Sequence, residues 1–107
     1  MPDIETLAAI AAEFSPQHKV VVAKWFGKPC LNADKRVFVV MWGRDLAFKL
    51  AGPDHAAALR IQGAHLFDPR GKGHAMKEWV QIPAAQSAQW SRVAKLALGY
   101  VSTLKED

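Results

Sequence analysis

The stretch that decides the fold is RVFVVMWGRDLAFKL, which runs from Arg36 to Leu50. Its first seven residues, 36–42, form a short apolar run rich in β-branched side chains, which favours a strand over a helix. Over 46–50 apolar side chains alternate with Ala and Lys, the pattern of a half-buried strand. Between these two segments, Gly43-Arg44 suits a two-residue turn with glycine at its first central position. The stretch therefore predicts an antiparallel β-hairpin.

The strand pattern extends to the N-terminal side of this hairpin. The β-branched run 20–22, Val-Val-Val, predicts a strand after Lys19, and residues 32–35 predict a turn before the hairpin. Pro29 breaks the first strand near Gly27, so its two halves need not be collinear. We therefore expect three or four antiparallel strands in sequence, a β-meander.

Helices and further strands are expected on both sides of the meander. Apolar side chains at helical spacing and capping residues predict three helices, which cover residues 3–14, 52–62 and 86–104. Trp90 lies on the apolar stripe of the last helix, so we place it in the core. Residues 65–67 form a short apolar piece, and residues 76–82 predict one more strand.

The order of predicted elements is α-βββ-α-β(β)-α. Strands joined by tight turns, with helices around them, predict an α+β fold in which a single antiparallel sheet has helices packed mainly on one face. The chain has 107 residues, of which 50% are hydrophobic, and this is enough for one core. We therefore interpret residues 1–107 as a single domain.

The composition points to the cytoplasm. The single cysteine, Cys30, cannot form an internal disulfide, and nothing else indicates secretion. The first residues carry acids and lack the basic start of a signal peptide. No apolar run approaches the roughly 20 residues that cross a bilayer. We expect a cytoplasmic protein with no membrane partner.

No catalytic or metal-binding motif is recognisable in the chain. The glycines around Lys72 lack the spacing of a phosphate loop, and no serine occupies a nucleophile elbow. Cys30 follows Lys28 closely, which suggests either a reactive thiol or, as we favour, a buried structural residue. The histidines lack the spacing of a metal site; they are His18, His55, His65 and His74. We predict a protein that is not an enzyme and carries no metal or cofactor.

The loop 68–75 and the strand after it carry the candidate binding site. The loop is rich in cations, and its glycines allow backbone amides to converge on a guest. If Met76, Val80 and Ile82 face the helices, Trp79 lies on the opposite face with Lys77 and Gln81. We predict a pocket for a phosphate or carboxylate, with a tryptophan as an apolar wall, formed by Lys49, Arg70, Lys72, Lys77 and Trp79. The other interpretation is a solvated loop that only connects two strands.

Three runs of the sequence resemble, in their order, the N-terminal-domain family of the TfoX/Sxy competence regulators. They are KWFGKPCL (24–31), VFVVMWGRDLAFKL (37–50) and FDPRGKGHAMKEWVQIP (67–83). The matched positions are Phe26, Gly27, Phe38, Lys49, Phe67, Pro69, Gly71, Met76 and Lys77. The resemblance covers nearly the whole chain and implies a small α+β domain with an antiparallel sheet. It further implies a small stand-alone member, related to regulators of DNA-uptake genes that carry a second, helical domain.

Three functions are left open by the sequence. The leading hypothesis is a small non-enzymatic binding or interaction module, a regulatory accessory whose favoured partner is another protein, and which is a monomer or a homodimer. The first alternative is a weak, sequence-independent nucleic-acid-binding domain or a transcription-related regulatory domain, motivated by the net charge of +4. The second is an anionic-ligand-binding protein or an enzyme that acts through Lys49 or Cys30. Nucleic-acid binding requires one contiguous patch of Lys19, Lys24, Lys28, Arg44, Lys49, Arg70, Lys72 and Lys77.

Overall fold

A computed structural model describes residues 4–14, 20–25, 27–33, 35–68 and 76–103. In chain order the elements are α1 (Ile4–Ala12), β1 (Val20–Trp25), β2 (Lys28–Ala33), β3 (Arg36–Trp42), β4 (Asp45–Lys49), α2 (Gly52–Leu59), β5 (His65–Phe67), β6 (Met76–Ile82), the 3-10 helix η1 (Ala84–Gln89) and α3 (Trp90–Ser102). The strands form one antiparallel sheet in the order β1-β2-β3-β4-β6-β5. The predicted α+β fold with a single antiparallel sheet is confirmed.

Four strands precede α2, whereas the predicted order had three. The segment taken as one interrupted strand is a hairpin, in which β1 and β2 pair from Val20↔Ala33 to Trp25↔Lys28. Gly27 lies in the turn with φ +74°, a conformation that glycine adopts at little cost. The chain therefore reverses at Gly27, and Pro29 falls inside β2.

The next two connections are also two-residue hairpins. Ala33 pairs with Arg36, and Trp42 pairs with Asp45. Gly43 has φ +60°, so the predicted turn with glycine at its first central position is confirmed. Three short turns thus fix the register of four successive strands.

A β-bulge in β3 controls which side chains enter the core. Leu31 pairs with Val39 and Asn32 with Val37, so Phe38 is an extra residue on β3. Because of this insertion, Phe38 and Val39 both pack into the cluster beneath the helices, while Val37 contacts the cluster on the other face.

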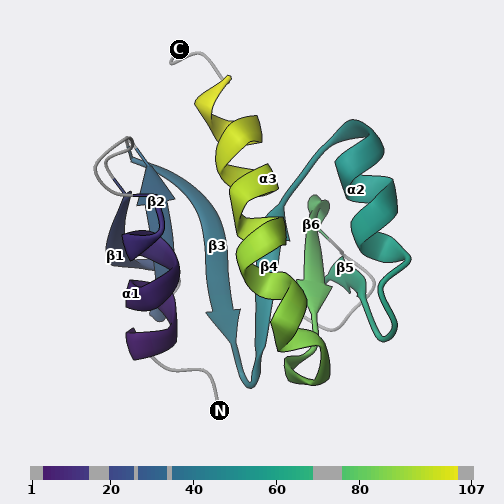
Figure 1. The fold of residues 1–107 in the computed structure, drawn as a ribbon, viewed down its shortest axis with the longest axis horizontal. Coiled ribbons are helices and arrows are strands. Elements are labelled where there is room, and N and C mark those ends of the chain that lie inside the picture. The colour runs from purple at the N-terminus through teal and green to yellow at the C-terminus, as the bar shows by residue number, and fades with distance from the viewer. Residues whose placement is uncertain (1–3, 15–19, 26, 34, 69–75, 104–107) are drawn as a thin grey trace.

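The helices pack on one face of the sheet, as predicted (Figure 1). Helix α1 contacts β1 and β2, α3 crosses β2 to β4, and α2 lies against β6. The core beneath them is apolar; its fully buried members include Leu7, Leu31, Phe38, Leu46, Phe48, Leu50, Val80 and Ile82. No helix in the described ranges is long and apolar enough to cross a membrane.

The predicted third helix starts as a separate 3-10 segment, η1, and becomes α-helical at Trp90. Asp45, at the start of β4, fixes this segment: its Oδ1 accepts from the Ala84 amide (3.2 Å) and its Oδ2 from the Gln81 side chain (2.7 Å). Trp90 is only 5% exposed and donates its indole N–H to the Ile82 carbonyl (3.2 Å), so its predicted place in the core is confirmed.

Candidate functional site

The face of the sheet turned away from the helices carries a second hydrophobic cluster. Its buried members are Cys30, Val40, Ala47, Phe67 and Trp79, and the half-buried side chains packed against them are Ala23, Trp25, Val37, Trp42 and Met76. These residues come from all the strands of the sheet. We call the four rings among them, Trp25, Trp42, Phe67 and Trp79, the aromatic cluster.

The ring contacts show that the sheet curls around this face. Trp25 on β1 and Trp79 on β6 stack with their ring centroids 5.0 Å apart and their planes at 27°. Their strands are four spacings apart in the sheet, which would be about 19 Å if the sheet were flat. Trp42 on β3 also meets Phe67 on β5, at 5.1 Å. The second face is therefore concave, and the aromatic cluster fills it.

An open groove of ≈ 600 Å³ lies beside the Trp25–Trp79 stack; it is lined by Trp25, Val37, Lys49, Met76, Lys77, Glu78 and Trp79. Lys49 on β4 is the direct cross-strand neighbour of Trp79. Lys77 precedes Trp79 by two residues on β6 and lines the same groove. The groove therefore joins an aromatic wall to two ammonium groups.

Three of the five predicted anion-site residues, Lys49, Lys77 and Trp79, line this groove together. The other two, Arg70 and Lys72, lie outside the described residues. Trp79 is only 5% exposed, so it belongs to the concave core more than to an open wall. The aromatic surface at the groove comes largely from the half-buried Trp25, which the site prediction missed.

The prediction that Met76 faces the helices is wrong. Val80 and Ile82 do pack beneath the helices, but Met76 contacts the cluster on the concave face. The pairing of β5 with β6 shifts register between Leu66 and Phe67, so that Phe67 pairs with Met76. This irregularity breaks the simple alternation on which the prediction relied.

Two contacts from the helices hold the β6 end of the groove. The His55 imidazole of α2 donates from Nε2 to the backbone oxygen of Lys77 (2.7 Å). The Tyr100 hydroxyl of α3 donates to a carboxylate oxygen of Glu78. The backbone that presents Lys77 is thus tied to α2, and the carboxylate of Glu78 is engaged by α3.

The contact between Tyr100 and Glu78 gives a direct pH prediction. Its hydrogen bond to Glu78, with desolvation and the nearby negative charge adding to it, raises the pKa of Tyr100 above its ordinary value of about 10. Because the raised pKa belongs to the folded state, this contribution to stability is complete below the ordinary pKa and is lost as the pH rises through the folded value. The chain has one tyrosine, so phenolate absorbance near 295 nm follows it alone. We expect Glu78→Gln to lower the midpoint of the Tyr100 titration. Identical midpoints in the variant and the unchanged protein would disprove the contact.

Cys30 lies in the concave core and is fully buried. Burial raises the pKa of its thiol, which keeps it protonated at neutral pH. A nucleophile or redox residue needs an accessible thiolate, so these observations favour the structural interpretation of Cys30 over the reactive one.

The described cations do not all gather on the concave face. Lys28 is there, with its ammonium group 5.4 Å from the centre of the Trp42 ring. Lys24, by contrast, lies between Ala23 and Trp25 on β1, and both of these contact the concave cluster, so alternation turns Lys24 to the other face. Arg44 sits in the β3–β4 turn, and Lys19 lies outside the described residues. This arrangement argues against the single patch that nucleic-acid binding requires.

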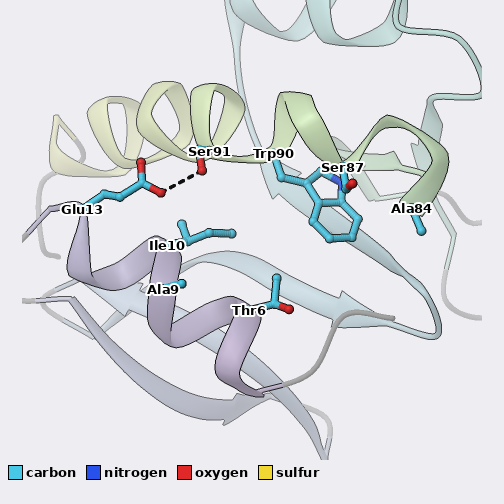
Figure 2. A pocket seen from close by; sticks show the side chains of 8 residues that line it. All are labelled: Thr6, Ala9, Ile10, Glu13, Ala84, Ser87, Trp90 and Ser91. Carbon is cyan, nitrogen blue, oxygen red and sulfur yellow. Dashed lines mark hydrogen bonds between the residues drawn. The ribbon is translucent and has the colours of Figure 1, made fainter.

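A second cavity, of ≈ 480 Å³, lies on the helix side between α1 and the start of α3 (Figure 2). The Trp90 ring and Ile10 point into it, and a hydrogen bond from Ser91 Oγ to Glu13 (2.8 Å) joins the two helices beside it. Its remaining lining residues are Thr6, Ala9, Ala84 and Ser87. Among the described residues the lining contains no cation, and its one carboxylate there already accepts a hydrogen bond, so its chemistry is less specific than that of the groove.

No family model, curated protein or solved structure matches this chain. The resemblance to the TfoX/Sxy N-terminal domains therefore stays a prediction from the sequence.

Proposed function

We propose that this protein is a small non-enzymatic binding module whose site is the groove on the concave face of the sheet. Its ligand is an anion, a phosphate or carboxylate, attached to a flat apolar body. The observation that carries the proposal is that Lys49 and Lys77 line the same groove as the stacked pair Trp25–Trp79.

The two kinds of lining residue supply two kinds of binding energy. Ammonium groups form charge-assisted hydrogen bonds with phosphate or carboxylate oxygens, and these are stronger than neutral ones. The half-buried indole of Trp25, stacked on Trp79, supplies apolar aromatic surface to the groove. A groove of ≈ 600 Å³ is within the usual size of small-molecule sites.

The lining supports binding more than catalysis. Among the described residues that line the groove, Glu78 is the one carboxylate, and it accepts the Tyr100 hydrogen bond. General acid–base chemistry requires a second group within hydrogen-bond reach of the reacting atoms, and these described lining residues include no histidine, serine or cysteine for that role. The regulatory role of the module is supported by the sequence resemblance alone.

The test is a titration with AMP, adenosine, inorganic phosphate and sulfate, observed through backbone amide shifts in NMR spectra. We expect AMP to bind more tightly than adenosine or phosphate, with shifts at residues 76–79 and at Lys49. Lys49→Gln and Lys77→Gln should each weaken AMP about 5- to 10-fold. Raising the salt concentration should also weaken AMP binding, because salt screens the charges of the two lysines. The matched control is Lys95→Gln, which removes the same charge from the exposed face of α3.

Two outcomes would overturn the proposal. If no backbone amide near the groove changes its chemical shift at millimolar AMP or phosphate, the groove does not bind anions. If Lys95→Gln weakens binding as much as Lys49→Gln does, the effect comes from net charge and not from a site. A single-stranded oligonucleotide tested in parallel decides the nucleic-acid alternative, because an extended basic surface would bind it far more tightly than a mononucleotide.

A further inference from the structure

The two edges of the sheet differ in length and in protection. The edge strand β5 has three residues, and its register with β6 is irregular. The opposite edge strand, β1, has six residues and pairs with β2 without a register shift. Proteins protect edge strands by keeping them short, by bulges, or by lysine or proline residues. β5 has the first two of these protections, whereas β1 is long and regular.

The first four residues of β1 also lack protective side chains. They are Val20, Val21, Val22 and Ala23, which carry neither charge nor proline. Val21 is 43% exposed and Val22 38%, and within the described residues these are the large hydrophobic side chains that are exposed. They project to opposite faces of the strand. A partner strand laid along this edge would therefore cover both.

The direction of the free backbone groups follows from the hairpin. Trp25 and Lys28 flank a two-residue turn, so they form a hydrogen-bonded pair. Hydrogen-bonded pairs recur at every second residue in an antiparallel ladder, which directs the N–H and C=O groups of Val21 and Ala23 toward β2. The same groups of Val20, Val22 and Lys24 are then directed outward, away from the sheet.

We propose that β1 pairs with β1 of a second copy of this chain, antiparallel, with a two-fold axis at Val22. In this register Val22 of one copy lies opposite Val22 of the other, and Val20 lies opposite Lys24. All three outward-directed residues are used, which gives about six hydrogen bonds across the interface. The exposed Val21 side chain packs against Ala23 of the other copy. The two sheets become one continuous sheet.

The charges on β1 favour this arrangement of two copies. A parallel pairing in register would set Lys24 directly against Lys24, and like charges opposite each other are destabilising. The antiparallel pairing separates the two lysines by four residues, about 13 Å along the strand. One strand pair buries less surface than the roughly 1,200 Å² of a stable interface, so we expect a weak dimer with a dissociation constant in the micromolar range.

Sedimentation equilibrium of the full chain up to about 1 mM tests the dimer. We expect a concentration-dependent shift from monomer to dimer. Val22→Lys places two like charges on the two-fold axis and should weaken the dimer at least about tenfold. The control Ala57→Lys adds the same charge at an exposed position of α2 and should leave the dimer unchanged. A protein that stays monomeric at 1 mM, or a dimer that Val22→Lys does not weaken, overturns the proposal.

Oxidative cross-linking tests the register independently of stability. In Val22→Cys the two new thiols face each other across the axis, so we expect disulfide-linked dimers under mild oxidation. In Lys24→Cys the thiols are about 13 Å apart, and no cross-link should form. Cys30 is buried and does not compete. Cross-linking of Lys24→Cys without that of Val22→Cys would show a different interface. The groove plays no part in this test, so it is independent of the proposed function.

Discussion

Trp90→Ala lowers the free energy of unfolding by about 3 to 5 kcal/mol. The indole is 5% exposed and lies in the core between α3 and the sheet. Its removal leaves a cavity beside Ile10 and also leaves the Ile82 carbonyl without its indole donor. Urea unfolding followed by far-UV circular dichroism measures the change.

Trp90→Phe separates the two contributions. The phenyl ring keeps most of the buried surface but cannot donate a hydrogen bond to the Ile82 carbonyl. We therefore expect the free energy of unfolding to fall by about 1 to 2 kcal/mol. This variant stays folded even if the alanine variant is too unstable to study. A loss below about 1 kcal/mol for Trp90→Ala would mean that the start of α3 is not packed on the sheet as described.

Trp79→Ala tests whether the concave face is a true core. The indole is 5% exposed, stacks on Trp25 and contacts Phe67 at 6.3 Å. We expect the free energy of unfolding to fall by about 3 to 5 kcal/mol, comparable with the loss for Trp90→Ala, although the helices of the described residues all pack on the other side of the sheet. Trp25→Ala removes a ring that is only half-buried, so it should lower the free energy of unfolding clearly less than Trp79→Ala does.

A double-mutant cycle isolates the stack between the two indoles. If Trp25 and Trp79 hold the curled sheet together, their coupling energy should be about 0.5 to 1.5 kcal/mol. Additive losses in the double variant would mean that the two rings are neighbours without mutual stabilisation. A cost below about 1 kcal/mol for Trp79→Ala would show that the concave cluster contributes little to folding.

Local sequence signals predicted most of the strands and three residues that line the groove. The Gly43-Arg44 turn and the alternation over 46–50 fixed the β3–β4 hairpin because both depend on neighbouring residues only. Alternation along the two strands allowed Lys49 and Trp79 to share a face, and the register makes them direct neighbours. Helical spacing likewise put Trp90 in the core.

What the sequence could not predict depends on contacts between distant residues. Trp25 reaches Trp79 because the sheet curls, and no local pattern encodes the curl of several strands. The hairpin at Gly27 required knowing that Trp25 and Lys28 pair, while proline suggested only a break. The start of η1 depends on Asp45, which is 39 residues before Ala84.

The uneven division of the tryptophans between the two faces has a spectroscopic consequence. Trp25, Trp42 and Trp79 lie in the concave cluster, and Trp90 alone lies beneath the helices. Three of the four indoles therefore lie on the side of the groove, and Trp90 donates its indole N–H to the end of β6. Excitation energy absorbed by Trp25 passes readily to Trp79, since their rings are in contact. The intrinsic fluorescence of the intact protein thus samples the concave face through three rings and the face beneath the described helices through one.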